Sequence, residues 1–500
     1  MPSYYSIHLG CRANQADAAA IEQDLSERGF TAAGHSANAD VVVLNSCTVT
    51  AAADAELRQL VRRIHRENPA ARILVTGCYA QRSPEELARL AGVEWVVGNS
   101  HKAEVARLLQ ESCASAAAPS SASSFVPLSN LLARPPSPLD TEFCRLGSVS
   151  PSASDPATLS ASNILVGDIS AQRHFLAVPF FGGATEDRTR PNLKIQDGCN
   201  NRCSFCIIPS VRGLSRSLPP QEAIAQVRVL AESGYREVVL SGVNLGQYGR
   251  DLSAKPRFFR LIQQILDETA VERLRLSSVE PMDFTDHLLD LMASTPRIAR
   301  HVHAPLQSGS DRILRRMHRK YRAAQYRERI LAAYDRMPRA AFGADVIVGF
   351  PGETDEDFDA TRRLIEDLPF TYLHVFPFSR RPGTPADRMK DQIHGGMVRE
   401  RGRILRQLSA EKNQRFREAH LGRTLRVLTL GEPDGAGTPA LSDNYLKVVL
   451  AGERLAANQW IEARIIALGD GCLIGEQAAP LGQPHTPAAD SPSMMTCASA

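Results

Sequence analysis

The chain has no apolar run long enough to cross a bilayer, so we expect no membrane-spanning helix. Its first residues, MPSYYSIHLGC, lack the charged and apolar segments of a secretory signal peptide. Net charge is also scarce, only +3 over 500 residues, so a surface for nucleic acid would have to come from local clusters of basic residues. These absences predict a cytoplasmic protein with no membrane partner.

Cysteine, in contrast, is well represented. In a reducing cytoplasm, grouped cysteines bind metal or take part in chemistry more often than they form disulfides. The chain length suggests about three domains, so the cysteines have to be placed in domains before they are interpreted. The ten cysteines are Cys11, Cys47, Cys78, Cys113, Cys144, Cys199, Cys203, Cys206, Cys472 and Cys497.

Residues 3–112 alternate strand-like and helix-like segments, which predicts an α/β domain with a parallel sheet. The expected strands cover 4–10, 40–46, 71–77 and 93–98, and the expected helices cover 17–30, 53–67 and 84–92. The last helix should begin with a capping box of Ser83 and Glu86. Residues 113–185 are rich in Ser, Ala and Pro, which predicts a low-complexity insertion, with 163–170 as a short ordered piece.

Residues 186–418 return to the alternation, with six βα units of similar length. This pattern predicts a (βα)6 partial TIM barrel whose chemistry lies at the carboxyl ends of its strands. Residues 419–480 contain short β-type runs separated by turn residues, which predicts a small β-barrel. Residues 481–500 are expected to form a disordered tail.

Three cysteines lie close together in the stretch DGCNNRCSFCIIP, directly after the first expected barrel strand. Cys199, Cys203 and Cys206 are separated by gaps of three and two residues, so three thiolates on one loop can hold three irons of a [4Fe–4S] cluster. The alternative is a structural zinc site, which normally needs four protein ligands. No fourth Cys or His follows nearby, which favours the cluster.

Three further cysteines follow three different expected strands of residues 3–112. Cys11, Cys47 and Cys78 would meet in space, because the carboxyl ends of parallel strands share one edge of the sheet. Gly10 and Gly77 precede two of them and allow close backbone approach. The alternative is three buried core cysteines. The remaining four cysteines lack such company, and we assign them no role.

The stretch LKIQDGCNNRCSFCIIPSVRG (193–213) resembles the radical S-adenosylmethionine signature of the methylthiotransferase family. LGCRAN, LNSCTV and TGCYAQ are similar to the amino-terminal domain of the same family. This resemblance implies two [4Fe–4S] clusters, each with one open iron. The cluster at Cys199, Cys203 and Cys206 would bind S-adenosylmethionine and generate a radical, and the other cluster would hold the sulfur to be donated.

The resemblance also points to residues that follow the barrel strands. We expect Phe205, Ser241, Glu280, Gln307 and Ser308 to line the S-adenosylmethionine pocket, and no catalytic residues beyond the cluster ligands. For any one of them, the alternative is packing at a strand end or helix capping, as in the ordinary capping pair of Thr354 and Asp357. The stretch RGLSR departs from the family pattern, because Leu214 stands where a basic residue is expected.

Basic residues gather in two stretches, 312–322 and 399–426. Such clusters attract phosphates, although a solvated helix face would have the same composition. The residues 419–480 are similar to TRAM RNA-binding modules, so the anticodon stem-loop of tRNA is the expected partner. An electron donor such as a flavodoxin or ferredoxin is a further expected partner.

Three motifs narrow the substrate. LGCRANQADA, NSCTVTAAAD and GCYAQRSPEEL most resemble the branch of the family that acts on N6-threonylcarbamoyladenosine in tRNA. The alternative substrate is N6-isopentenyladenosine at the same position, and a third branch modifies a ribosomal protein. A competing class of protein is a zinc-stabilised RNA-binding protein without catalysis.

Overall fold

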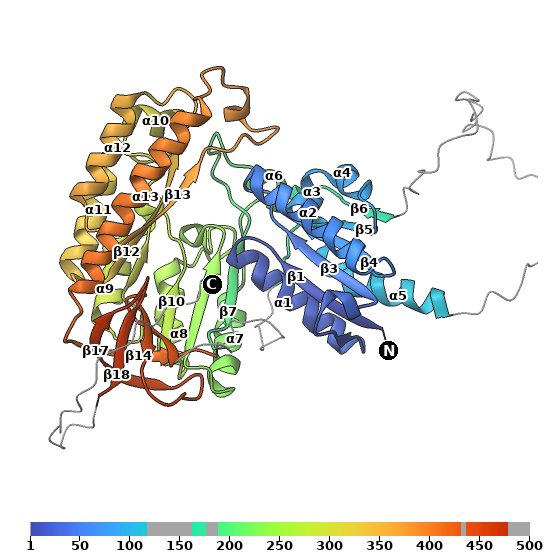
Figure 1. The fold of residues 1–500 in the computed structure, drawn as a ribbon, viewed down its shortest axis with the longest axis horizontal. Helices are drawn as coiled ribbons and strands as arrows, with labels where there is room; N and C mark the ends of the chain where they lie inside the picture. Colours follow the sequence, from blue (N-terminus) through green and yellow to red (C-terminus); the bar gives the residue numbers. More distant parts are fainter. Residues whose placement is uncertain (1, 118–162, 177–188, 432–436, 479–500) are drawn as a thin grey trace, which may run out of the picture.

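The computed structural model describes residues 2–117, 163–176, 189–431 and 437–478. They form an amino-terminal sheet domain, a central partial barrel and a small carboxyl-terminal barrel (Figure 1). Most of the predicted insertion, and the predicted tail at 481–500, lie outside the described residues. None of the helices described combines the length and the apolar character needed to span a bilayer.

The amino-terminal domain has one parallel sheet of six strands in the order β2-β1-β3-β4-β5-β6. Residues 163–170 include β6, so the expected ordered piece joins this sheet. The strands are β1 Ser3–His8, β2 Thr31–Ala32, β3 Val41–Ser46, β4 Arg72–Gly77, β5 Val93–Gly98 and β6 Ile164–Leu165. The helices are α1 Arg12–Glu27, α2 Ala51–Glu67, α3 Cys78–Arg82, α4 Pro84–Ala88 and α5 Val105–Ala117.

Helices cover both faces of this sheet because alternate strand residues point to opposite faces. Val42 and Leu44 of β3 pack with α2 and α4, whereas Val41 and Val43 pack with α1 and α5. The burial of β3 on both faces matches the uninterrupted apolar run at residues 41–44. A sheet covered on both faces leaves its strand ends as the place for ligands.

Two local predictions in this domain were wrong. Helix α1 begins at Arg12 rather than at residue 17, so it starts directly after Cys11. Ser83 makes no side-chain capping bond and instead separates α3 from α4, with φ −143° and ψ 63°. The backbone leaves β4 through Gly77 and turns into α3 at once, so the helical segment starts earlier than the capping pattern suggests.

The central domain contains six parallel strands flanked by helices, as predicted. Pairing runs from β7 through β9 to β10 and from β11 through β12 to β13, and the bridge between Leu274 and Ile298 joins the two groups. The strands are β7 Asn192–Asp197, β9 Glu237–Gly242, β10 Arg273–Leu276, β11 His301–His303, β12 Ala341–Val348 and β13 Tyr372–Pro377, with the short antiparallel β8 Arg216–Ser217 beside β7. The helices are α6 Ile208–Arg212, α7 Pro220–Glu232, α8 Phe258–Glu268, α9 Asp286–Ser294, α10 Asp311–Arg316, α11 Ala323–Arg336, α12 Asp355–Asp367 and α13 Gly395–Glu418.

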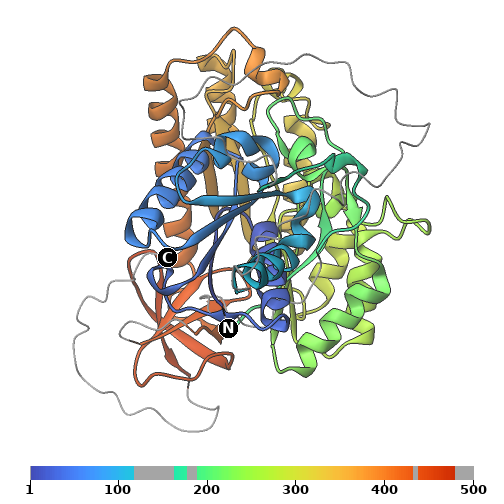
Figure 2. The same cartoon turned by 90° about the vertical axis from the view of Figure 1, so that its right-hand side faces the viewer.

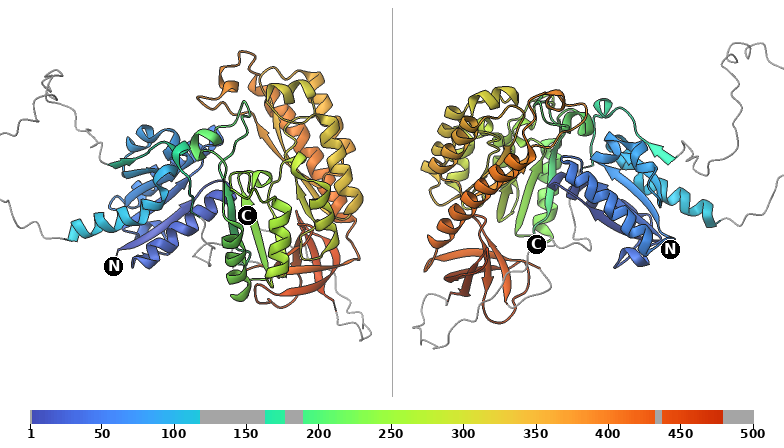
Figure 3. Two further views of the ribbon diagram at one scale, coloured as in Figure 1. Left: turned by 180° about the vertical axis from the view of Figure 1, so that it is seen from behind. Right: turned by 45° about the horizontal axis from the view of Figure 1, so that its top comes forward.

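The barrel is open between β7 and β13, and the amino-terminal domain lies at this opening. Figure 1 and both views of Figure 3 show the amino-terminal sheet next to β7, and Figure 2 shows it in front of the barrel strands. Helix α1 packs against β7 and β9. The amino-terminal domain therefore supplies a wall that the incomplete barrel lacks.

Helix α13 leads from the barrel to a closed barrel of five strands in the order β14-β15-β16-β18-β17. This small barrel packs on the base of the central domain, where Arg275 of β10 donates to the carbonyls of Ser442 and Asp443 at 2.9 and 3.1 Å. The predicted α/β fold class with a small terminal β-barrel is confirmed. The strands are β14 Thr424–Thr429, β15 Thr438–Ser442, β16 Lys447–Leu450, β17 Trp460–Leu468 and β18 Leu473–Gln477.

Candidate active site

The loop that carries Cys199, Cys203 and Cys206 leaves β7 and is held at several points along its length. The amide of Cys199 donates to the carbonyl of Gly213 at 3.1 Å, and the amide of Ser204 donates to the carbonyl of Met317 at 3.1 Å. Gly198 has φ +70°, and a Cβ there would lie 2.0 Å from the carbonyl oxygen of Leu214. Only glycine allows the chain to turn so tightly at the start of this loop.

The three thiols of this loop, which we call the local trio, lie close to one another. Burial, together with the charges of Cys203 and Cys199, raises the pKa of Cys206 to about 12. Burial also raises the pKa of Cys199. A guanidinium nitrogen of Arg319 donates to Cys203 Sγ at 3.2 Å, and a second nitrogen of Arg319 binds the Glu280 carboxylate. One cation therefore lies against a group of thiols that repel each other as thiolates.

Cys11, Cys47 and Cys78, which we call the dispersed trio, follow β1, β3 and β4. These three strands are neighbours in the sheet, so their carboxyl ends meet at one edge, as predicted. Gly10 has φ +97°, and a Cβ there would lie 2.6 Å from Cys47 Cβ and 2.8 Å from Cys47 Sγ. Glycine at this position lets two cysteine-bearing segments touch.

Electrostatics and burial agree that the dispersed trio is grouped. Burial, together with the charges of Cys78 and Cys11, raises the pKa of Cys47 to about 12. Cys47 and Cys78 are buried, whereas Cys11 is exposed and therefore does not act as a core residue. These observations favour a grouped thiol site over the alternative of three core cysteines.

The two trios adjoin each other across the domain junction. Cys78 packs in one apolar cluster with Ile207 and Val211, and Ile207 directly follows Cys206 of the local trio. The Asn99 side chain joins the same contact, because its Nδ2 donates to the Val211 carbonyl at 2.7 Å and lies 3.5 Å from Cys78 Sγ. The segment that follows the local trio is thus in direct packing contact with Cys78 of the dispersed trio.

Next to the dispersed trio lies a buried ion network that the sequence analysis missed. Asp17 of α1 accepts from Lys102 at 2.8 Å and from Arg212 at 3.0 Å, and it also pairs with Lys194 of β7. Asp197 accepts from Arg212 at 2.9 Å. Burial alone would raise the pKa of each carboxyl group, but these cations hold both pKa values well below the usual range.

This network leaves surplus positive charge beside the thiols. Two carboxylates face four cations, namely Lys102, Lys194, Arg212 and Arg216, and all six side chains are buried. The pKa of Arg212 is raised well above its ordinary value, because its carboxylate partners and the thiols of Cys78 and Cys11 outweigh its burial. Within the RGLSR stretch, Arg212 is therefore part of the buried network, whereas Leu214 is 52% exposed.

A second ion cluster fixes the other edge of the opening. Asp54 of α2 accepts from Arg381, which follows β13, at 2.6 Å and from Arg82 at 3.0 Å. Thr48, next to Cys47, donates its hydroxyl to Asp54 at 2.6 Å. The amino-terminal domain is thus clamped at the β7 edge by Asp17 and at the β13 edge by Asp54.

The five residues predicted for the S-adenosylmethionine pocket have different surroundings. Glu280 lines a cavity of about 180 Å³ together with Cys203 and Arg319. The Ser241 hydroxyl is buried at the end of β9 without a hydrogen-bond partner. Gln307 adopts φ +63° after β11.

Ser308 and Phe205 instead contact the surrounding scaffold. The Ser308 hydroxyl lies 3.2 Å from that of Thr361, and Phe205 packs edge-on against Phe350. These contacts fit the structural alternative of strand-end packing and do not by themselves separate it from ligand binding. The capping box of Thr354 and Asp357 at the start of α12 is confirmed.

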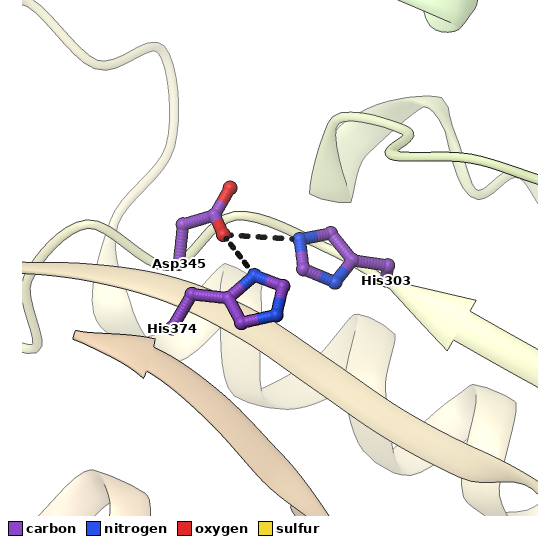
Figure 4. Close-up of side chains that lie close together, drawn as sticks. All are labelled: His303, Asp345 and His374. Carbon is purple, nitrogen blue, oxygen red and sulfur yellow. Dashed lines mark hydrogen bonds and ion pairs between the residues drawn. The ribbon is translucent and has the colours of Figure 1, made fainter. Parts of the chain in front are cut away.

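A polar wall inside the barrel was also missed. His303 Nε2 and His374 Nδ1 both lie against Asp345 Oδ1, at 3.2 and 3.1 Å (Figure 4). The Tyr372 hydroxyl lies 2.6 Å from His301 Nε2 and 2.9 Å from His303 Nδ1, so one hydrogen-bonded chain runs across three strands. The HVH sequence of β11 indicates that two histidines lie on one face of the strand, because alternate residues of a strand share a face.

The small barrel contributes to the base of this wall. Tyr445, in the turn between β15 and β16, stacks on His301 with ring centroids 4.6 Å apart. Its φ of +64° is uncommon for a bulky residue, and such conformations gather at functional sites. The terminal barrel therefore reaches into the central barrel as well as supporting it.

The two basic stretches are less exposed than their composition suggested. Arg319 is buried, Arg312 pairs with Asp357, and Arg401 pairs with Glu353. In α13, Arg399 and Arg406 are exposed and have no ion pair among the described residues. They lie seven residues apart and thus on one face of the helix.

Comparison with known proteins identifies this constellation. Residues 193–365 match the radical SAM superfamily, and residues 3–98 match the uncharacterized protein family UPF0004. The threonylcarbamoyladenosine tRNA methylthiotransferase MtaB of Aquifex aeolicus (strain VF5) is 35% identical, over 89% of this chain and 95% of that protein. The chain belongs to the MtaB family of methylthiotransferases.

Two more distant proteins place this methylthiotransferase in a wider group. A tRNA-2-methylthio-N(6)-dimethylallyladenosine synthase of Pelotomaculum thermopropionicum (strain DSM 13744 / JCM 10971 / SI) is 28% identical, over 91% of this chain and 96% of that protein. The radical S-adenosylmethionine methyltransferase TsrM from Kitasatospora setae is 15% identical, with a TM-score of 0.50 over 77% of this chain and 75% of that structure. The second likeness concerns the fold alone.

As a radical SAM enzyme, this methylthiotransferase uses an iron–sulfur cluster and S-adenosylmethionine. The residues present fit these groups, since none of the six grouped thiols forms a disulfide. At the ends of β9 and β10, three buried polar atoms have no hydrogen-bond partner within the part of the chain that the structure describes, namely Ser241 Oγ, Asn244 Oδ1 and Ser277 Oγ. A polar ligand at the strand ends would satisfy them.

Proposed function

We propose that this chain converts N6-threonylcarbamoyladenosine next to the anticodon of tRNA to its 2-methylthio derivative. The observation that carries the proposal is the contact of two separate cysteine trios across one domain junction, with Cys78 packed on the segment that follows Cys206. A single trio would suffice for radical formation. A second trio beside it supplies a site for the sulfur to be transferred.

In this proposal, each trio holds a [4Fe–4S] cluster. Cys199, Cys203 and Cys206 ligate one cluster, and Cys11, Cys47 and Cys78 ligate the other. Phe205, Ser241, Glu280, Gln307 and Ser308 would line the S-adenosylmethionine pocket at the first cluster. When bound, these groups supply a carbon-centred radical and a transferable sulfur. A radical is needed because the C–H bond at C2 of adenine offers no acidic proton for a general base.

The protein itself positions the reacting groups and balances their charge. Arg319 lies against Cys203, and Arg212 faces Cys78 and Cys11, so each set of thiolates has a buried cation beside it. The Asp17 and Asp54 clusters hold the amino-terminal domain over the opening of the barrel. This clamping fixes the position of the dispersed trio relative to the local trio.

The RNA is proposed to bind along α13 and the small barrel, which is a TRAM-like module. Arg399 and Arg406 are free to contact phosphates. The anticodon stem-loop is a suitable partner because its bases are already partly unstacked. We further propose a cytoplasmic location and a flavodoxin or ferredoxin as electron donor. The functional units are residues 3–112, 186–418 and 419–480, with 113–185 as an insertion and 481–500 as a tail.

The experiment uses the full chain reconstituted anaerobically with iron and sulfide. Two clusters would give about eight irons per chain, whereas a zinc-stabilised RNA binder would give zinc and no visible absorption. Anticodon stem-loops that carry either N6-threonylcarbamoyladenosine or N6-isopentenyladenosine are then incubated with S-adenosylmethionine and a reductant, and nucleosides are analysed by mass spectrometry. Methylthio product from the isopentenyl RNA alone would contradict the proposed substrate.

The RNA surface is tested with the double variant Arg399→Gln and Arg406→Gln. Loss of two phosphate contacts should weaken binding of all stem-loops to a similar degree and reduce the salt slope of binding by about 2. A matched control is Arg362→Gln on α12, because Arg362 already pairs with Asp359 and Glu366. An unchanged salt slope in the double variant would remove α13 from the RNA surface.

A further inference from the structure

Arg12 differs from every other cation described at the domain junction. Lys102, Lys194 and Arg212 all have carboxylate partners, whereas the Arg12 guanidinium has no hydrogen bond or ion pair among the described residues. Arg12 is half-buried and is the first residue of α1, directly after Cys11. A partly buried cation without a counter-ion is costly unless a ligand supplies the negative charge.

The backbone of Arg12 is fixed at the opening of the barrel. Its carbonyl accepts a hydrogen bond from Asn192 Nδ2 of β7 at 2.7 Å. Helix α1 packs against β7 and β9, so its first residue lies where the sheet domain and the barrel meet. This position places the side chain between the dispersed trio and the interior of the barrel.

The charge of Arg12 is felt at the polar wall inside the barrel. Burial lowers the pKa of His301 most, and Arg275, His303 and then Arg12 lower it further. Burial raises the pKa of Tyr372, and the charge of Arg12 opposes that rise. His301 and Tyr372 belong to the wall that Figure 4 draws in part, so the charge of Arg12 lies near this wall.

The carboxylates of this wall are not available to Arg12. Asp345 already accepts from His303 and His374, and Glu237 at the base of the barrel is paired with Arg273 and Arg275. The described wall therefore presents one unpaired guanidinium beside imidazole and phenol groups. Such a surface favours an anionic, hydrogen-bonding ligand over an apolar one.

We propose that Arg12 binds the carboxylate of the threonylcarbamoyl group and selects this substrate against adenosines whose N6 substituent has no acid group. The inference rests on the proposed function and deepens it. A guanidinium presents a planar pair of N–H donors that matches a carboxylate, so recognition combines charge with orientation. An isopentenyl group would leave the Arg12 guanidinium without a partner, which lowers the affinity for that substrate.

The test measures binding of labelled anticodon stem-loops to the reconstituted full chain by fluorescence anisotropy. Four RNAs are compared: threonylcarbamoyl-modified, its methyl ester, isopentenyl-modified and unmodified. The wild type should bind the threonylcarbamoyl RNA roughly 10- to 100-fold more tightly than the methyl ester. Arg12→Gln should remove this difference, and Arg12→Lys should restore part of it.

Arg28→Gln provides a matched control at the other end of α1. Arg28 is exposed and pairs with Asp24 at 2.7 Å, so its loss should leave the preference for the free acid unchanged. Iron content and the absorption spectrum of each variant are measured in parallel. Equal iron in wild type and Arg12→Gln would show that the altered binding does not come from a damaged cluster.

Two results would overturn the role of Arg12. If Arg12→Gln weakened all four RNAs equally, the side chain would contact a backbone phosphate instead of the substituent. If the wild type bound the threonylcarbamoyl RNA and its methyl ester with equal affinity, no residue would recognise the carboxylate. Both differ from failure of the proposed function, in which the wild type would form no methylthio product from the threonylcarbamoyl RNA.

Discussion

The two cysteine trios reach similar arrangements by different routes. The local trio lies on one loop, residues 199–206, which is anchored by carbonyls of Gly213 and Met317. The dispersed trio spans residues 11–78 and depends on three strands of one sheet. The local trio is thus a property of a loop, whereas the dispersed trio is a property of a domain.

Their charged surroundings differ in the same way. Arg319 reaches the local trio from the end of the neighbouring helix α10 within the same domain. The dispersed trio faces Arg212, which belongs to the other domain and is held by Asp17 and Asp197. Damage to the domain junction should therefore affect the dispersed trio before it affects the local one.

The largest expected effect comes from removing one ligand of each trio. Cys203→Ser should lose about four of about eight irons and all formation of 5′-deoxyadenosine. Cys47→Ser should lose the other irons and still form 5′-deoxyadenosine, because radical formation needs only the local trio. Both should form no methylthio product. Iron analysis and chromatography of the nucleosides measure these outcomes.

Cys113→Ser is the control for these variants, since Cys113 lies away from both trios beside Arg72. It should keep all the iron and the activity. Complete loss of iron in Cys47→Ser would mean that the two trios do not assemble independently.

Asp17→Asn should produce the next largest effect. It leaves three buried cations around a neutral amide, and breaking a buried ion cluster costs about 3–5 kcal/mol. The free energy of the first unfolding transition in urea should fall by this amount, and iron should be lost from the dispersed trio first. Asp24→Asn, on the same helix, removes a more exposed pair with Arg28 and should cost less than about 1 kcal/mol.

A charged cluster that touches neither trio shows how much a buried ion pair stabilises the fold without any effect on iron binding. Arg275 and Arg273 lower the pKa of the buried Glu237 to about 2, despite the opposing effect of burial. A carboxyl group with a lowered pKa stabilises the fold above its ordinary pKa, and this stabilisation is lost as pH falls toward the folded value. The free energy of unfolding of the wild type should therefore exceed that of Glu237→Gln by roughly 3 kcal/mol at neutral pH.

This difference should shrink as pH falls from about 4.3 to about 2. Urea unfolding of both proteins at a series of pH values measures it. Iron content at neutral pH should be the same in both proteins. A difference that grew toward acid would contradict the assigned direction of the shift.

Arg319→Gln should have the smallest effect, a change in rate, because it removes the contacts to Cys203 and Glu280 and no cluster ligand. Loss of one charge-assisted hydrogen bond to Cys203 should slow formation of 5′-deoxyadenosine roughly tenfold, about 1.4 kcal/mol. Iron content should remain as in the wild type, and Arg319→Lys should recover part of the rate. Arg327→Gln, an exposed residue of α11 paired with Asp367, is the control.

Much of the fold could be predicted because its signals are local. Apolar runs predicted the strands. The spacing of three cysteines pointed to the local trio, and the position of three others after expected strands pointed to the dispersed trio. The capping pair of Thr354 and Asp357 was likewise readable, since both residues belong to one helical turn. The failures at Ser83 and at the start of α1 occurred where the chain leaves a strand through a glycine and is redirected at once.

The site beyond the cysteines could not be predicted, because its partners come from distant segments. Arg319 was assigned to a basic surface, yet the end of α10 turns it inward to Cys203. Asp17 and Lys102 were unremarkable in sequence, and only the docking of α1 on β7 brings them to Lys194 and Arg212. Charge patterns along a chain do not reveal which charges will be buried together.

By itself, the sequence determined that six thiols are available in two groups. One group follows a single parallel strand, and the members of the other group follow three different parallel strands. The tertiary structure decided that the groups adjoin, that buried ions of both signs join the domains, and that Arg12 has no ion pair among the described residues. The physical reason is the range of the forces involved. Strand and loop preferences act between neighbours in the chain, whereas burial of charge depends on which surfaces exclude water when the domains meet.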